Sequence, residues 1–142
     1  MDPRSSGRSS TGPPLHSPAL AYLILGEGVF ARSNALNLRY LAALDMDRLL
    51  APFRIEAGLP SPAAKYPNWE SMGLDGHTAG HYLSALAQQA AQGQAPMRRR
   101  LGYMIDALAQ CQRANGEGYV GGVRGGRTLW DRIACGDLQA EA

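Results

Sequence analysis

The sequence predicts an all-α fold built of helical hairpins. Apolar residues recur at spacings of three and four in three long stretches, which is the signature of amphipathic helices. A short turn with Gly93 and Pro96 joins the second and third stretches, as expected for an antiparallel hairpin. With 45% hydrophobic and 18% charged residues, the 142-residue chain has the composition of a globular domain.

The first residues do not fit this helical pattern. Residues 1–18 are rich in Ser, Gly, Pro and Arg, which predicts a disordered leader before a domain spanning 19–142. The apolar run 20–25 is too short to span a bilayer, and no cleavage pattern follows it. We therefore find no convincing signal peptide, which leaves a cytoplasmic location by default. We expect a short strand or an extended segment packed on the domain, ended by Gly26 and Gly28.

The first predicted helix runs from Phe30 to Leu44 and is apolar around most of its circumference, which is typical of a helix sandwiched between others. Asn34 and Asn37 lie on its apolar stripe, so they must find buried partners or line a cavity. A second short helix, 46–51, is predicted to be capped by Asp45 and stopped by Pro52. The connection 53–67 is then long, and long ordered loops are often binding loops.

Residues 69–85 concentrate the chemically capable side chains. Asp75 is a good candidate for the N-cap of a helix whose apolar stripe is Leu83, Leu86, Ala87 and Ala90. His77 and His81 are four residues apart, so both rings leave the same face near the helix N-terminus. This end carries positive potential and free N–H donors, and Trp69 offers a flat apolar plate beside it. The pattern favours a ligand rich in hydroxyls or carrying negative charge.

The third long helix has a predicted apolar stripe and ends at Asn115-Gly116. The stripe consists of Leu101, Met104, Ile105, Leu108 and either Cys111 or Gln112. Cys111 is interpreted as core filler, because a buried free cysteine behaves as a small hydrophobe. Tyr119 lies in a glycine-rich loop that we expect to be mobile, and 129–133 is expected to begin another helix.

Several alternative functions are disfavoured. Residues 116–121 match a dinucleotide fingerprint and residues 121–128 imitate a phosphate loop, but neither has a strand before it. A formal charge of +2 is too small to indicate nucleic acid or an anionic membrane, and the basic run 98–100 is interpreted as a solvated helix turn. Cys111 and Cys135 fit neither a disulfide framework nor a zinc spacing.

Three interpretations of His77 and His81 remain open at this point: metal ligands, polar contacts to a ligand such as a sugar, and purely structural histidines. A zinc site needs a third protein ligand, and only Glu70 or Asp75 is near in sequence. The glutamate of a zinc protease helix is absent between the two histidines. Glu70 and Asp75 are also candidate acid/base carboxylates for glycosidic cleavage.

Several stretches resemble the bacterial beta-L-arabinofuranosidases of glycoside hydrolase families 127 and 146. The resemblance runs from about Leu25 to Trp130 and rests on a long composite motif. Its parts are Leu38-Arg39-Tyr40-Leu41, Asp47-Arg48-Leu49-Leu50-Ala51-Pro52-Phe53, Glu56-Ala57-Gly58-Leu59, Trp69-Glu70, Gly73-Leu74-Asp75-Gly76-His77, Gly80-His81-Tyr82-Leu83-Ser84-Ala85 and Gly118-Tyr119-Val120-Gly121-Gly122.

The resemblance implies an (α/α)6 barrel of helical hairpins acting on arabinofuranosides, of which this chain would form an incomplete, N-terminal part. Such enzymes are thought to use a cysteine nucleophile in a zinc-thiolate cluster and a glutamate acid/base, all from later in a much longer chain. Cys111 and Cys135 do not match those positions. We therefore assign no catalytic residue and no metal or cofactor in this chain, and expect zinc in the full-length family enzyme.

By the same resemblance, we expect Trp69, Glu70, Asp75, His77 and His81 to contact substrate, with Tyr119 as a weaker candidate. The function predicted is that of a glycosidase fragment, inactive alone, that acts on L-arabinofuranosides. The alternative is a non-catalytic helical protein, derived from the barrel, that binds carbohydrate or another partner. We expect a carbohydrate partner, neither nucleic acid nor membrane, and self-association through exposed apolar helix faces.

Overall fold

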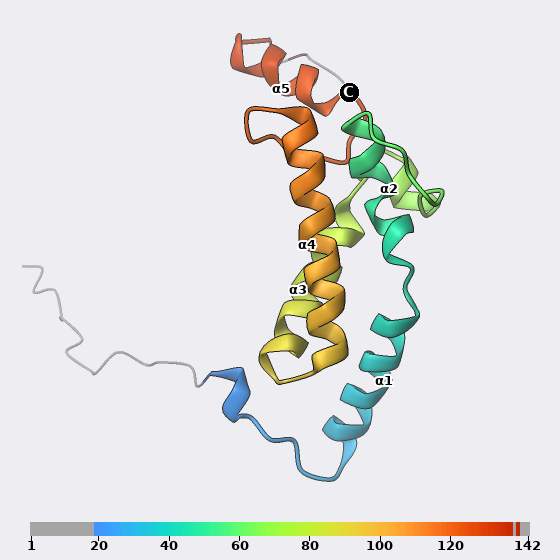
Figure 1. The fold of residues 1–142 in the computed structure, drawn as a ribbon, viewed down its shortest axis with the longest axis vertical. Helices are drawn as coiled ribbons and strands as arrows, with labels where there is room; N and C mark the ends of the chain where they lie inside the picture. The colour runs from blue at the N-terminus through green and yellow to red at the C-terminus, as the bar shows by residue number, and fades with distance from the viewer. Residues whose placement is uncertain (1–18, 138, 140–142) are drawn as a thin grey trace, which may run out of the picture.

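The fold is seen in a computed structural model that describes residues 19–137 and 139. All regular elements in this part of the chain are helical (Figure 1), which confirms the predicted all-α class. They are the 3-10 turns η1 (Leu20–Tyr22) and η2 (Asn68–Ser71) and the helices α1 (Val29–Ala43), α2 (Met46–Glu56), α3 (His77–Ala91), α4 (Ala95–Asn115) and α5 (Gly126–Ala134). The predicted leader, residues 1–18, lies outside the described residues.

The centre of the molecule is the predicted antiparallel hairpin of α3 and α4 (Figure 1). Gly93 adopts a left-handed conformation at φ +87°, one residue beyond the C-cap Gln92 of α3. The N–H of Gly93 donates to the carbonyl of Ala90 at 3.1 Å, and the N–H of Gln94 donates to that of Gln89 at 3.1 Å. This pair of bonds is a Schellman motif, which satisfies carbonyls that the helix end would leave free.

The hairpin buries much of the hydrophobic core. Helices α3 and α4 contribute Ala79, Tyr82, Leu86, Met97, Met104 and Ala107, and α1 and α2 add Leu41, Leu49 and Leu50. Two predicted stripe residues are wrong, because Ile105 and Ala87 face solvent. The buried Ala107 and Tyr82 lie on the opposite edges of the two stripes from Ile105 and Ala87, and Cys111 rather than Gln112 is buried. The stripes are therefore rotated slightly from the prediction.

Helix α2 begins as predicted but ends later. The carboxylate of Asp45 accepts from the N–H groups of Asp47 at 2.9 Å and Arg48 at 3.4 Å, which confirms the predicted cap. Pro52 does not stop the helix, which continues to Glu56. A proline lacks the N–H of one ladder bond, but Pro52 is buried, and burial of its ring offsets part of that loss. The predicted loop that began at Phe53 therefore starts after Glu56.

Helices α1 and α2 follow one another beside the hairpin (Figure 1), but α1 is not sandwiched among the described elements. It packs on α3, and of its residues only Leu41 is buried. Phe30, Leu36 and Tyr40 stay exposed. Within the described residues no second element covers the face of α1 that carries these side chains. The prediction that α1 packs between other helices is therefore wrong for this part of the chain.

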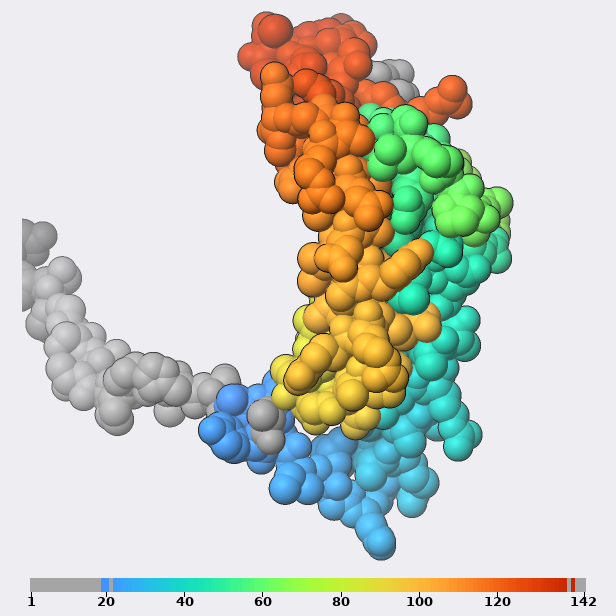
Figure 2. All heavy atoms as spheres, viewed as in Figure 1, coloured from blue at the N-terminus to red at the C-terminus, as the bar shows by residue number. Residues whose placement is uncertain are grey.

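The segment before α1 is not a strand. Leu20–Tyr22 form a 3-10 turn next to α3, and residues 23–25 follow without regular structure, largely exposed. An isolated extended segment has no ladder partner here, so its backbone gains nothing from strand geometry. In Figure 2 this segment lies at one end of the molecule and α5 at the other.

Helix α5 begins at Gly126, three residues before the predicted start near Leu129. Its early start is set by Gly125, whose left-handed φ of +70° turns the chain into the helix. None of the helices in the described residues is long and apolar enough to cross a membrane.

Candidate functional site

The candidate site is built around the start of α3. The predicted N-cap, Asp75, is wrong: Gly76 holds that position, at φ +89° and without a side-chain cap of its own. Instead the carboxylate of Glu70, in η2, accepts from the N–H of Gly76 at 2.6 Å and from the N–H of Thr78 at 2.7 Å. Glu70 is only 3% exposed, and its negative charge lies against the positive end of the helix. A remote carboxylate therefore replaces the local cap.

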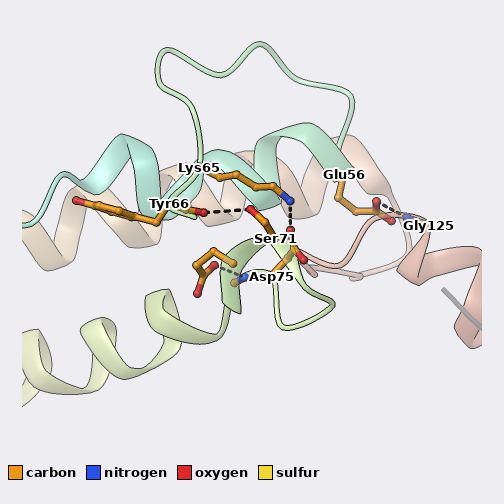
Figure 3. A network of polar contacts seen from close by, with 8 residues as sticks. Glu56, Lys65, Tyr66, Ser71, Asp75 and Gly125 are labelled. Atoms are coloured by element: carbon orange, nitrogen blue, oxygen red, sulfur yellow. Dashed lines mark hydrogen bonds and ion pairs between the residues drawn. The ribbon is translucent and has the colours of Figure 1, made fainter. Parts of the chain in front are cut away.

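Asp75 is used in a different contact. Its carboxylate pairs with the ammonium of Lys65, which reaches down from the loop after α2 (Figure 3). Its backbone, together with Gly76, packs against Gly122 of the loop before α5. A Cβ on Gly122 would come within 2.8 Å of the Asp75 carbonyl oxygen. Position 122 therefore requires glycine, and three segments distant in sequence meet at the start of α3.

Three of the predicted site residues come together at this helix end. The rings of Trp69 and His77 lie with centroids 6.1 Å apart, and those of His77 and His81 lie 4.5 Å apart, both in edge-to-face arrangements. The Nε2 atoms of the two histidines are 3.2 Å apart, within hydrogen-bond distance. All three side chains are exposed. They form a continuous accessible surface of one indole and two imidazoles.

Two adjoining hollows lie between α1, η2 and the first turns of α3. The larger, of about 510 Å³, is lined by Tyr40, Leu44, Leu49, Tyr66, Pro67, Asn68, Trp69, Glu70 and Thr78. The smaller, of about 220 Å³, is lined by Asn37, Tyr40, Leu41, Leu44, Thr78, His81, Tyr82 and Ala85. Because Tyr40, Leu44 and Thr78 border both, the hollows form one groove. We call it the α1–α3 groove.

The asparagines on α1 were predicted either to find buried partners or to line a cavity, and one of them does each. Asn34 accepts a hydrogen bond from the side-chain amide of the buried Gln89 at 2.9 Å, whereas Asn37 lines the α1–α3 groove. Sequence reasoning singled out neither Tyr40 nor Thr78 as site residues. The signal available in the sequence was Tyr40 itself, because an aromatic ring with a polar tip suits a wet cavity wall.

A network of polar contacts fixes the walls of the groove. The hydroxyl of Tyr82 donates to the carbonyl of Leu41 at 2.9 Å and accepts from Nε of Arg100 at 2.5 Å. The same guanidinium donates to the carbonyl of Leu44. Arg100 and Tyr82 thus tie the last turn of α1 to the hairpin, where its carbonyls would otherwise lack partners. The predicted solvated turn 98–100 is therefore wrong at Arg100.

The weaker candidate, Tyr119, lies away from the groove. Its hydroxyl end packs beneath Gly121 and Gly126, where a Cβ would collide with the ring. Burial, and secondarily the carboxylate of Glu56, raises the pKa of Tyr119. The loop it anchors carries further bonds, from Gln112 to Gly118 at 2.7 Å and from Asn115 to Tyr119 at 3.4 Å. Tyr119 is thus held at the base of α5, outside both hollows.

The cysteines do not fit the zinc-thiolate cluster that the resemblance implies for the complete enzyme. Cys111 is fully buried on α4, where desolvation raises the pKa of its thiol, and Cys135 is exposed just after α5. Over residues 19–137 and 139, no three His, Cys, Asp or Glu side chains gather as a metal site. We therefore derive no chemical step through such a cluster.

Comparison with known proteins gives one family. No curated protein matches the sequence. The family model described as beta-L-arabinofuranosidase, GH127 catalytic domain, matches residues 24–135, which includes η2, the start of α3 and the α1–α3 groove. The chain therefore belongs to the family of the glycoside hydrolase family 127 beta-L-arabinofuranosidase catalytic domains.

Proposed function

We propose that this chain supplies an L-arabinofuranoside-binding surface, the α1–α3 groove, of a glycosidase. The observation that carries the proposal is the grouping of Trp69, His77 and His81 at the open edge of that groove. Sugars present an apolar face and a rim of hydroxyls. An exposed indole suits the first and imidazole nitrogens suit the second.

The groove walls carry further groups of the same two kinds. Tyr40, Tyr66 and Trp69 are aromatic, while Asn37, Asn68 and Thr78 bring amide and hydroxyl groups. Ligand sites commonly combine apolar walls with a few placed polar groups, in hollows of about 300 to 1,000 Å³. We infer direct sugar contacts for Trp69, His77 and His81. For Glu70 and Asp75 we infer a positioning role, since their carboxylates already hold the helix start and Lys65.

This use of the carboxylates supports a chain that binds without cleaving. Glycoside hydrolysis uses two carboxyl groups, or a comparable nucleophile and acid, on either side of the scissile bond. Both oxygens of Glu70 accept backbone N–H groups, and Asp75 is paired with Lys65. We propose that the 142 residues alone lack glycosidase activity, and that they correspond to an N-terminal part of a family 127 or 146 barrel. The non-catalytic carbohydrate-binding alternative predicts the same binding surface.

The proposal is tested by binding and turnover on the same protein. Titration calorimetry with arabinofuranosyl oligosaccharides should show binding that His81→Ala weakens by about 0.5 to 1.5 kcal/mol, the net worth of one hydrogen bond. Gln88→Ala, an exposed change farther along α3, should leave the affinity unchanged. A nitrophenyl arabinofuranoside should not be hydrolysed. Absence of binding at millimolar sugar, or equal losses in both variants, would refute the proposed surface.

We also propose that two copies associate through the exposed face of α1 and the segment before it. Tyr22, Ile24, Val29 and Phe30 are all more than half exposed, and several large apolar side chains exposed within one short segment favour an interface. Light scattering should report dimers that dissociate on dilution. The double change Ile24→Ser with Phe30→Ser should leave a monomer. A wild-type monomer at all concentrations would contradict the proposal.

A further inference from the structure

His77 and His81 bring two ring nitrogens close together on one face of α3. Their Nε2 atoms lie 3.2 Å apart and both rings are exposed. A first-row metal ion binds imidazole nitrogen at about 2.0 to 2.1 Å. Two nitrogens at that radius and 3.2 Å apart subtend about 100° at the ion, between the octahedral and tetrahedral angles.

We propose that His77 and His81 together bind one divalent transition-metal ion, Cu²⁺, Ni²⁺ or Zn²⁺, through their Nε2 atoms. In the structure these atoms share one hydrogen bond, which requires a proton on one of the two. Metal binding places both ring protons on Nδ1 and replaces that hydrogen bond with two coordination bonds. Because both side chains are exposed, the small ring rotations that aim both lone pairs at one ion meet little resistance.

The charged groups at the start of α3 do not exclude a cation from the pair. The positive end of α3 disfavours a cation, but the carboxylate of Glu70 lies against that same end. Lys65 and Asp75, which also lie near the start of α3, form an ion pair with each other. No third His, Cys, Asp or Glu among the described residues joins the pair, so water or a ligand hydroxyl fills the other positions. The site is therefore open. It selects among metal ions through its two imidazole ligands more than through a fixed coordination geometry.

This site is separate from the zinc-thiolate cluster expected of the complete enzyme, because it uses two imidazoles and no thiolate. Imidazole sites bind Cu²⁺ more tightly than either Ni²⁺ or Zn²⁺. We therefore expect Cu²⁺ to bind most tightly. The ion would lie at the edge of the α1–α3 groove, since His81 borders the smaller hollow.

The experiment is a metal titration followed by Trp fluorescence in a Trp130→Phe, Cys135→Ser background. These changes leave Trp69 as the reporter and remove the exposed thiol, a competing ligand. Cu²⁺ or Ni²⁺ should quench Trp69 with a stoichiometry of one ion per chain. His77→Gln and His81→Gln should each weaken binding about tenfold or more, because a second ring on the same helix binds its ion at high effective concentration.

The third histidine of the chain, His16, provides the matched control: His16→Gln should not change the affinity. In NMR spectra Ni²⁺ should broaden the ring signals of His77 and His81 together. Equal affinity in the His77→Gln, His81→Gln double variant, with circular dichroism confirming that it is folded, would overturn the proposal. So would absence of binding at millimolar metal.

Discussion

Helices α3 and α5 begin in the same way, although only one of these starts lies at a candidate site. Each has a left-handed glycine as N-cap, Gly76 at φ +89° and Gly125 at φ +70°. In each, a glutamate from an earlier segment accepts from the N–H of that glycine and from the N–H two residues later. Glu70 does so at 2.6 and 2.7 Å, and Glu56 does so at 2.8 and 3.4 Å (Figure 3 for Glu56 and Gly125).

The two starts differ in what surrounds them. Gly76 is buried against the ring of Phe53 and Glu70 is buried beside the α1–α3 groove, whereas Gly125 is exposed and open. At the start of α3 the N–H groups of Gly76 and Thr78 donate to Glu70, and that of His77 donates to the carbonyl of Leu74, so these donors are not free to bind a ligand. The comparison teaches that a capped helix start is a structural device. The binding surface arises from the aromatic and imidazole side chains that only α3 and η2 bring to it.

The largest difference is expected from adding a methyl group to each capping glycine. A Cβ on Gly76 would lie 2.6 Å from Cζ of Phe53, whereas one on Gly125 would meet nothing within 4 Å. Left-handed alanine costs about 1 to 2 kcal/mol, and overpacking adds about 1 to 3 kcal/mol. Gly76→Ala should therefore lower the free energy of unfolding by about 2 to 5 kcal/mol and Gly125→Ala by about 1 to 2 kcal/mol. Urea unfolding checks this, and equal losses would break the distinction.

The next largest difference concerns the two glutamates. Glu70→Gln places an amide group against two backbone donors in a buried site, which should cost about 2 to 3 kcal/mol. Glu56→Gln acts at a half-buried, more loosely bonded site and should cost about 0.5 to 1 kcal/mol. Hydrogen exchange should place the Glu70→Gln loss in the first turn of α3. If Glu56→Gln lowers the free energy of unfolding as much as Glu70→Gln, burial is not the reason for a difference between the two caps.

A smaller, pH-dependent effect is expected near α5. Burial raises the pKa of Tyr119 above its usual value near 10, so the folded protein holds this proton more tightly than the unfolded chain. This contribution to stability is complete below pH 10 and is lost as the pH rises through the higher folded-state pKa. Tyr119→Phe should reduce the loss of stability between pH 9 and 11. An unchanged alkaline profile in that variant would contradict the assignment.

Periodicity predicted much of the fold because it depends on local spacing. The α3–α4 hairpin, its turn at Gly93, the Asp45 cap and the end of α4 at Gly116 are all confirmed. The continuation of α2 through Pro52 was missed, since the burial of a residue depends on the packing of the whole chain. The capping role of Glu70 was also missed. No local pattern shows that a carboxylate six residues before Gly76 caps the helix in place of Asp75.

The sequence also predicted that Trp69, His77 and His81 belong together, because spacing on one helix and the residues just before it are local properties. It did not indicate the opposite wall. Tyr40 and Asn37 reach the groove through the packing of α1 on α3, and Tyr119 is held away from it by the glycines around α5. Such long-range placements require the three-dimensional structure. The direct contacts to sugar stay predictions.

The most direct test of the binding surface compares the two tryptophans, one beside each helix start. Both are more than half exposed, Trp69 beside α3 and Trp130 on α5. Arabinofuranosyl oligosaccharides should shift the fluorescence of the Trp130→Phe variant, in which Trp69 reports, with saturation at increasing sugar. The Trp69→Phe variant, in which Trp130 reports, should show no change and weaker binding by calorimetry. A response from Trp130 alone, with full affinity retained in Trp69→Phe, would contradict the placement of the site at α3.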